Sequence, residues 1–330
     1  MTSQIPNKAT PLPPGVYCPV LSLYKSTARQ EIDLEASYNY FKFLILGGVT
    51  GLVLAGTTAE AVLLSADERV ELTKVAKKVV TDLGLPDYPL VAGISGQSTN
   101  ESIRLAEAAK EAGADFGLLL PPSYWSKVVT KDVILGFYRE VADASPMPVV
   151  IYNFPAVTAG IDLDSDIIAE LAEHPNIVGV KLTCGNVGKL TRLTADFSPK
   201  QFAVYGGSSD YLIPALIGGG SGCVTGIGNV YPKSVSKLYT LYQEGKIAEA
   251  AKLQGLVAHA EKACKAGIAA TKYGAAYFAG PVAGVKDKAS FLPRKPYAPA
   301  NETMQAWVVK TMAHLEKVEK ELPDRQCPGL

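Results

Sequence analysis

The stretch NIVGVKLTCGNVGKL, from Asn176 to Leu190, shows the alternation of strand and helix on which the fold prediction rests. Its first half is an apolar run of strand length, rich in β-branched residues, with small residues between them. Such a run is typical of a strand buried on both faces. Lys181 stands inside this run. Because a charged ammonium in a sheet interior costs several kcal/mol unless it is paired or neutral, we expect this lysine to have a function.

Seven further runs of the same kind occur along the chain, and amphipathic helical patterns separate them. One such pattern follows Ser65, which we expect to cap its helix, and another lies between Asn100 and Gly113, a predicted cap at each end. Eight strands alternating with helices predict a (β/α)₈ barrel. The seven other strand candidates are GVYCPVLSL, GLVLAGT, PLVAGIS, DFGLLLPP, PVVIYNFP, FAVYGGSS and GCVTGIGN.

An open, doubly wound sheet is the rival architecture. It would normally carry a GxGxxG phosphate fingerprint after its first strand, and none occurs there. We therefore predict a TIM barrel over residues 15–230. Residues 1–14 are expected to form a flexible tail, and residues 231–330, where the pattern becomes helical only, an appended C-terminal helical domain.

The composition excludes several functional classes. Among 330 residues, Lys+Arg and Asp+Glu balance at 32 each, so neither nucleic acid nor a membrane surface is an expected partner. The uncharged segment from Tyr211 to Pro232 contains a proline and many glycines, and predicts a buried helix and strand, not a membrane span. Five cysteines without CxxC spacing indicate reduced thiols, and the opening residues lack the apolar stretch of a signal peptide. We expect a cytoplasmic protein.

Metal and serine-hydrolase chemistry find no support in the sequence. The three histidines are scattered without the spacing of metal ligands, and no GxSxG occurs. No cofactor is expected.

In a barrel, functional groups gather at the carboxyl ends of the strands. Thr57 and Thr58 follow the second run, Tyr124 the fourth, Tyr152 ends the fifth, and Lys181 lies in the sixth. These five residues are expected to converge on one mouth of the barrel.

That combination has a chemical logic. Burial favours the neutral, nucleophilic form of a lysine amine, which forms a Schiff base with a ketone. A nearby tyrosine can move protons as the carbon–carbon bond breaks, and two threonines beside a glycine turn can offer hydroxyl and N–H groups to a carboxylate. The set predicts a 2-oxo acid aldolase. Taken singly, each part also has a structural explanation: a snorkelling or ion-paired lysine, a strand followed by a turn, a common loop.

Three motifs in order, GTTAE, YNFP and GVKLT, resemble those of the dihydrodipicolinate synthase / N-acetylneuraminate lyase family of pyruvate-handling class I aldolases. The resemblance extends over residues 16–230 and more weakly into the helical tail. It implies that Lys181 forms the Schiff base, that Tyr152 is the proton donor and acceptor, and that Thr57 and Thr58 bind the pyruvate carboxylate. It further implies that Tyr124 enters the site of a neighbouring subunit, so that the assembly is a dimer or a homotetramer made of two dimers.

Ala59 departs from the family pattern, which has glycine there. It is expected to reduce the conformational freedom of the turn's backbone slightly, because alanine resists positive φ. The run KLTCGNVGKL resembles fungal 2-keto-3-deoxy-L-galactonate aldolases. Thr183 resembles the sugar-acid lyases of the family and is a candidate to contact a substrate hydroxyl. Ser208, with its neighbours Ser209 and Asp210, is another such candidate or, equally, a helix N-cap.

Val157 argues against one activity of the family. In dihydrodipicolinate synthase the resemblance places an arginine five residues beyond the strand-five tyrosine, and Val157 stands there in this chain. An apolar side chain cannot bind the carboxylate of aspartate semialdehyde as arginine does.

We therefore predict a lyase that splits or forms a 2-keto-3-deoxy sugar acid, with pyruvate and an aldehyde such as L-glyceraldehyde. The alternatives are a 4-hydroxy-2-oxoglutarate aldolase and a dihydrodipicolinate synthase. N-acetylmannosamine is a further possible aldehyde partner. A catalytically silent barrel that binds small acids is the alternative outside enzymology.

Overall fold

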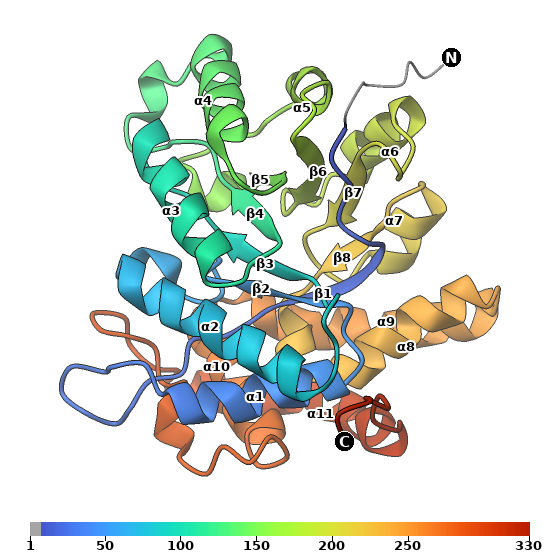
Figure 1. The fold of residues 1–330 in the computed structure, drawn as a ribbon. Helices are drawn as coiled ribbons and strands as arrows, with labels where there is room; N and C mark the ends of the chain where they lie inside the picture. Colours follow the sequence, from blue (N-terminus) through green and yellow to red (C-terminus); the bar gives the residue numbers. More distant parts are fainter. Residues whose placement is uncertain (1–7) are drawn as a thin grey trace.

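Every apolar run of the sequence forms a strand in the computed structural model, which describes residues 8–330 (Figure 1). The strands are parallel, neighbours in the chain are neighbours in the sheet, and β8 pairs with β1 to close the barrel. The predicted TIM barrel is confirmed. The strands are β1 (Gly15–Pro19), β2 (Gly51–Leu54), β3 (Leu90–Gly93), β4 (Phe116–Leu119), β5 (Val149–Asn153), β6 (Ile177–Leu182), β7 (Ala203–Gly206) and β8 (Gly222–Val224).

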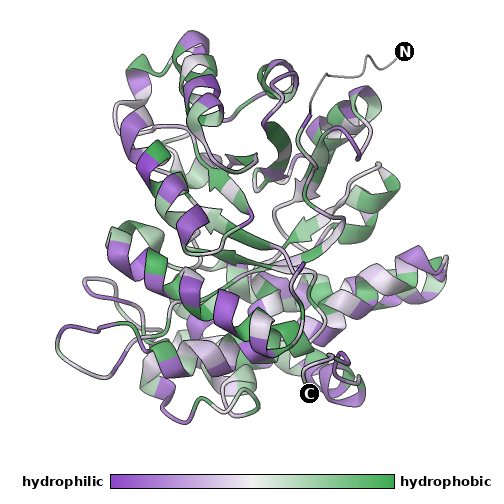
Figure 2. Ribbon diagram, viewed as in Figure 1, coloured by the Kyte–Doolittle hydropathy of each residue, from purple (hydrophilic) through white to green (hydrophobic). Residues whose placement is uncertain are grey.

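Helices surround the strands and turn their apolar faces inward; the strands are mostly hydrophobic, whereas the helices alternate between hydrophobic and hydrophilic residues (Figure 2). Helix α7 and strand β8 occupy the uncharged segment, as predicted. Within residues 8–330, no helix is long and apolar enough to span a membrane. The outer helices are α1 (Leu34–Leu46), α2 (Ala66–Asp82), α3 (Thr99–Glu111), α4 (Lys131–Ala144), α5 (Ser165–Ala172), α6 (Val187–Asp196) and α7 (Leu212–Ile217).

The helix caps confirm one prediction and correct another. Ser65 caps α2 in a reciprocal capping box with Glu68. The predicted cap Asn100, however, lies inside α3, which begins two residues earlier after Ser98. The extended backbone of Ser98 lets its hydroxyl accept from the N–H of Glu101. Gly113 follows the end of α3 with φ +105°, as expected of a glycine there.

A β-bulge in β6 decides where Lys181 points. Val149 pairs with Ile177 but Val150 pairs with Gly179, so one extra residue is inserted into β6. A one-residue shift moves every later side chain to the opposite face, and Lys181 therefore pairs with Tyr152 and faces the barrel interior. Glycine is required at the bulge, because a Cβ on Gly179 would lie 2.5 Å from a backbone oxygen of β7.

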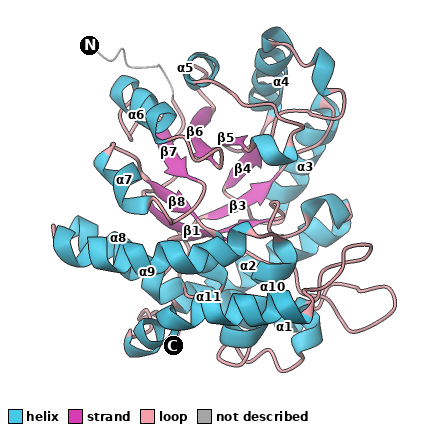
Figure 3. Cartoon of the chain, turned by 180° about the vertical axis from the view of Figure 1, so that it is seen from behind, coloured by secondary structure: helices cyan, strands magenta, loops and turns pink. Residues whose placement is uncertain are grey.

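The remaining helices follow β8 and lie together beside α1 and β1, in both views of the chain (Figures 1 and 3). Helix α8 contacts β1 as well as α9, so it joins the barrel to the other helices. The division into a barrel and a helical domain at residue 230 remains a proposal. These helices are α8 (Pro232–Gln243), α9 (Ile247–Lys265), α10 (Ile268–Gly274) and α11 (Glu302–Glu321).

The segment predicted as a flexible tail is anchored over the part that the structure describes, residues 8–14. The Lys8 ammonium donates to three backbone oxygens between α5 and β6. Tyr17 and Tyr205, inside the barrel, donate to the carbonyl of Pro13, which lies under the barrel floor. Residues 1–7 lie outside the described residues. The mouth at the opposite end, where the strands finish, carries the predicted functional groups.

Candidate active site

Lys181 differs from every other buried lysine of the described chain. Lys189 and Lys272 are also buried, but each has a carboxylate partner. Lys181 is 4% exposed and has no ion-pair or hydrogen-bond partner among residues 8–330; its Nζ lies over the ring of Tyr152, 4.0 Å from the centroid. A buried amine without a counter-ion is available as a nucleophile.

Tyr152 connects this lysine to the loop after β2. Its ring is stacked on Phe154 with centroids 5.8 Å apart, and the side chain is 3% exposed. Its hydroxyl lies 3.4 Å from Oγ1 of Thr57. Three of the predicted residues, Lys181, Tyr152 and Thr57, are therefore brought together from β6, β5 and the β2 loop.

The loop after β2 folds like the first turn of a helix. The Gly56 carbonyl accepts from the N–H groups of Ala59 and Ala61, and the Thr57 carbonyl accepts from that of Glu60. Within the described residues, the N–H groups of Thr57 and Thr58 have no acceptor. Free N–H groups at the start of such a turn form a binding site for an anion.

The expected effect of Ala59 on this turn is wrong. Ala59 does not adopt positive φ; the residues that do are Ala55 (φ +47°) and Glu60 (φ +57°). Ala59 is fully buried and its carbonyl accepts from the Ser22 hydroxyl, so alanine fits at this position without strain.

A cavity of about 280 Å³ opens beside Thr57 and Tyr152. Val157 lines it, from the loop after β5, and so does Arg69, from α2. The Arg69 guanidinium donates to the carbonyl of Ala61, and burial lowers its pKa from the ordinary value. Sequence reasoning missed Arg69 because it precedes no recognisable motif and lies on a helix, away from the strand ends.

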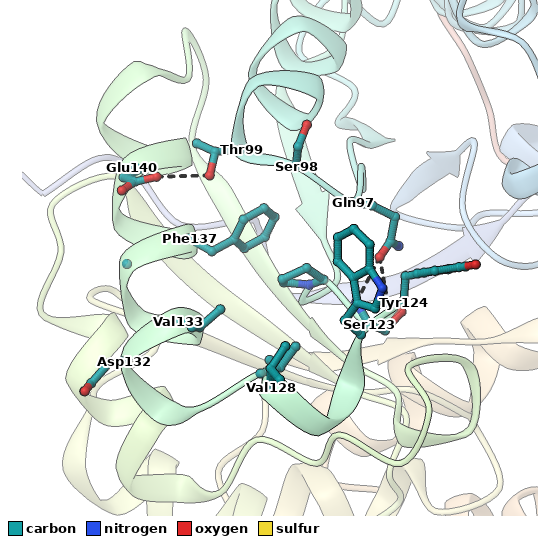
Figure 4. A pocket seen from close by; sticks show the side chains of 14 residues that line it. Gln97, Ser98, Thr99, Ser123, Tyr124, Val128, Asp132, Val133, Phe137 and Glu140 are labelled. Atoms are coloured by element: carbon teal, nitrogen blue, oxygen red, sulfur yellow. Dashed lines mark hydrogen bonds between the residues drawn. The ribbon is translucent and has the colours of Figure 1, made fainter.

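Tyr124 does not join the others within one chain. Its ring is 80% exposed and packs edge-on against Trp125, and the N–H groups of Ser123 and Tyr124 donate to the side chain of Gln97 (Figure 4). The pair borders a shallow cavity of about 820 Å³ between α3 and α4, formed largely by apolar side chains such as Val128. An aromatic pair this exposed is typical of a protein–protein contact.

Thr183 and Ser208 have different surroundings. Thr183 Oγ1 is buried without a hydrogen-bond partner among residues 8–330, and it packs against Gly207, where a Cβ would lie 2.2 Å from it. Ser208 Oγ donates to Asp210 at 2.7 Å. The helix-cap alternative for Ser208 is wrong, because Tyr211 is the N-cap of α7 and no side chain caps that helix.

Asn153 is a site residue that the analysis of YNFP left without a role. Its amide donates to Asp162 at 2.7 Å and accepts from the N–H of Leu163, which fixes the loop that carries Val157. Lys189 donates to the same carboxylate. Partial burial opposes ionisation of Asp162, but the hydrogen bonds from Asn153 and Lys189 outweigh it and hold its pKa below the usual value. The available signal was a polar residue at the end of an apolar strand.

The described residues contain no group of three His, Cys, Asp or Glu side chains able to hold a metal ion. The candidate site offers an amine, a phenol, hydroxyls and backbone N–H groups. Together they can form an imine with a 2-oxo acid and transfer protons beside it.

Comparison with known proteins supports this interpretation. The sequence profile of the dihydrodipicolinate synthetase family matches residues 14–315. A Coccidioides immitis protein with the provisional name of a mitochondrial 4-hydroxy-2-oxoglutarate aldolase is 46% identical over 93% of this chain and 96% of its own. An L-threo-3-deoxy-hexylosonate aldolase of Aspergillus niger is 33% identical over 96% of this chain and 98% of its own.

Two solved structures share the fold. A dihydrodipicolinate synthase family protein from Coccidioides immitis superposes with a TM-score of 0.89 at 44% identity, covering 96% of this chain and 99% of its own. The prophage protein YagE from E. coli K12, solved in complex with pyruvate, superposes with a TM-score of 0.81 at 27% identity, covering 93% of this chain and 98% of its own.

Proposed function

This chain belongs to the dihydrodipicolinate synthetase family, and from that premise we propose that it is a Schiff-base aldolase that cleaves a 2-keto-3-deoxy sugar acid into pyruvate and an aldehyde such as L-glyceraldehyde. The observation that carries the proposal is the buried, unpaired Lys181 amine beside the Tyr152 ring. Relatives named as aldolases, and a relative solved with pyruvate, support the class of reaction.

In the proposed reaction, the neutral amine of Lys181 attacks the C2 ketone of the substrate. The carbinolamine loses water to give a protonated imine, which serves as an electron sink. The C4 hydroxyl then gives up its proton, the C3–C4 bond breaks, and its electron pair enters the enamine while the aldehyde leaves. Protonation at C3 and addition of water release pyruvate and restore the amine.

Tyr152 is the proposed proton carrier. Its ring lies beside the amine, and Thr57 Oγ1, 3.4 Å from its hydroxyl, is a second oxygen through which a proton can pass. The carboxylate of the substrate is assigned to the turn at Thr57 and Thr58, whose free N–H groups and hydroxyls suit an anion. Bound there, the carboxylate holds C2 next to the lysine.

The aldehyde half of the substrate is assigned to the 280 Å³ cavity. Val157 lines it, which disfavours the second carboxylate of aspartate semialdehyde and fits a neutral, hydroxylated chain. Thr183 and Ser208 are the proposed partners of substrate hydroxyls. For Thr183 this requires a χ1 rotation, since its hydroxyl is now turned against Gly207.

A second candidate substrate is 4-hydroxy-2-oxoglutarate, and Arg69 is the observation that favours it. This guanidinium lines the cavity and keeps donors beyond the one bonded to Ala61, so it can meet the carboxylate of a glyoxylate half. Two relatives carry names of that activity.

Tyr124 is proposed to act in the site of a partner subunit, as its 80% exposure and the apolar cavity beside it suit a dimer contact (Figure 4). We propose a homotetramer made of two such dimers. The cytoplasmic location also remains a prediction: two relatives are named mitochondrial, and fractionation of cells with an antibody to the full chain tests it.

A panel assay of pyruvate release tests the function. The substrates are a 2-keto-3-deoxy sugar acid, 4-hydroxy-2-oxoglutarate and N-acetylneuraminate, each given to the wild type and to Lys181→Met. We expect the highest kcat/KM with the sugar acid and no release by the variant. If 4-hydroxy-2-oxoglutarate is the better substrate and Arg69→Leu lowers kcat/KM for it alone, the second candidate holds. Release of pyruvate from none would favour a silent, acid-binding barrel.

A further inference from the structure

The turn that is assigned to the substrate carboxylate ends in a strained, buried glutamate. Glu60 follows Thr57, Thr58 and Ala59 directly, with φ +57° and ψ +39°, and is 6% exposed. Left-handed backbone is unfavourable for a residue with a Cβ, and a buried carboxylate is unfavourable without a partner. A left-handed backbone and a buried carboxylate therefore persist at one residue only where surrounding contacts stabilise them.

The contacts that stabilise Glu60 come from residues much later in the chain. The Lys272 ammonium of α10, fully buried, lies 2.5 Å from Oε2 of Glu60 and also donates to the Leu292 carbonyl. The N–H of Arg294 donates to Oε1 of Glu60 at 2.8 Å. Both carboxylate oxygens are thus held by residues more than two hundred positions away in sequence.

Lys272 is itself enclosed. Its Nζ lies 4.4 Å from the centroid of the Tyr24 ring, and the Arg294 guanidinium lies 4.8 Å from the same ring. Arg294 in turn pairs with Glu68 in α2, through both of its terminal nitrogens. Burial lowers the pKa of Lys272 to about 8, so it is mainly protonated at neutral pH and can pair with Glu60.

This arrangement connects the helical region to the anion-binding turn. If the ammonium is removed, the buried Glu60 carboxylate loses its ion-pair partner and keeps the N–H of Arg294, and the cheapest relief is to turn it toward water. That movement releases the left-handed residue and shifts the N–H groups of Thr57 and Thr58, which have no acceptor within the described chain. The lysine nucleophile on β6 is not part of this network.

We infer that Lys272 is a positioning residue: through Glu60 it holds the Thr57–Thr58 turn in the shape that binds the carboxylate of a 2-oxo acid. The inference rests on the proposed function of that turn. It predicts a specific defect, namely weaker binding of pyruvate with an intact nucleophile.

The test is a titration with pyruvate, trapped by borohydride and quantified by mass spectrometry of the whole protein. It reports the half-saturating pyruvate concentration and the maximal adduct yield separately, and needs no aldehyde. For Lys272→Met we expect the half-saturating concentration to rise about 10- to 100-fold, the equivalent of one charged hydrogen bond, with the maximal yield unchanged. The double variant Glu60→Gln/Lys272→Met removes both charges and so guards against misfolding. Its half-saturating pyruvate concentration should also rise, with a smaller loss of thermal stability than in Lys272→Met.

The matched control is Lys233→Met/Glu319→Gln. Glu319 is another buried carboxylate among the C-terminal helices, which accepts from Ser234 and from the backbone N–H of Lys233. The Lys233 ammonium pairs with Asp324, and within residues 8–330 neither Lys233 nor Glu319 bonds to the turn. We expect it to lower the melting temperature and leave pyruvate binding unchanged. The inference would be overturned if the half-saturating pyruvate concentration were unchanged in both test variants. It would also be overturned if this concentration rose in the control variant together with its loss of thermal stability. No adduct in the wild type would overturn it together with the proposed function.

Discussion

Tyr152→Phe separates catalysis from structure at the proposed site. The substitution removes one hydroxyl and keeps the ring, which holds Lys181 over its face at 4.0 Å and stacks on Phe154. Within the described part of the chain that hydroxyl has a single partner, Thr57 Oγ1, at the long distance of 3.4 Å. Its loss should therefore lower the free energy of unfolding by no more than about 1 kcal/mol.

The expected effect on turnover is much larger. A positioned proton-transfer group contributes about 10²–10⁴-fold in rate, which corresponds to about 3–5 kcal/mol of transition-state stabilisation. If the hydroxyl did no more than bond Thr57, kcat would fall by about tenfold or less. The loss of kcat expected for a proton carrier therefore exceeds that expected for a structural hydroxyl by at least about one order of magnitude.

The assay compares kcat for pyruvate release, imine trapping and thermal unfolding in one set of proteins. Tyr88→Phe is the matched control: this buried hydroxyl donates to the Val49 carbonyl at 2.9 Å, just before β2 begins and away from the barrel mouth. We expect Tyr152→Phe to lose turnover and keep its melting temperature, and Tyr88→Phe to keep turnover and lose melting temperature. A Tyr152→Phe enzyme within about tenfold of wild-type kcat would refute the proton-carrier role.

Three further predictions concern specificity, assembly and pH. With pyruvate and aspartate semialdehyde, condensation should be at least about 10²-fold slower than with L-glyceraldehyde, because Val157 offers no bidentate charged bonds; equal or faster rates with the semialdehyde would be incompatible with that argument. Tyr124→Phe should lower kcat about 10²-fold while sedimentation still shows an oligomer, and a fully active monomeric wild type would contradict the partner-subunit role. Burial raises the pKa of Glu261, and the hydrogen bonds from the Ser209 and Thr225 hydroxyls only partly oppose this rise. The protonated carboxyl therefore stabilises the fold fully at pH values below the ordinary carboxyl pKa. This stabilisation is lost as the pH rises through the raised pKa. Urea unfolding of Glu261→Gln from pH 5 to 8 should accordingly show a weaker fall in stability with rising pH than the wild type; parallel curves would disprove it.

The sequence was sufficient for the architecture because each strand is an apolar run bounded by turn residues, and period and length alone distinguish such runs from helices. It was also sufficient for placing Lys181, Tyr152 and Thr57 at one end of the barrel, since parallel strands in a barrel finish at the same face. The misplacement of the α3 cap at Asn100 has a local cause: three consecutive residues, Ser98 to Asn100, can each cap a helix, and the backbone conformation selects one of them.

Other features depend on contacts that no local pattern encodes. The inward direction of Lys181 follows from the bulge at Gly179, which is visible in sequence only as a glycine within a strand. The same holds for the distinction between Lys181 and the two other buried lysines, because their carboxylate partners lie 27 and 212 residues away. The exposure of Tyr124 is likewise a property of the folded chain.

The measurement that tests the central claim most directly is identification of the residue that pyruvate modifies. The full-length protein is incubated with saturating pyruvate, reduced with borohydride, digested and sequenced by mass spectrometry, with Lys181→Met, Lys189→Met and Lys272→Met treated in parallel. The account predicts one reduced pyruvate adduct per chain, on Lys181, absent from Lys181→Met and retained in the other two variants. An unmodified wild type, or an adduct that persists in Lys181→Met, would contradict it.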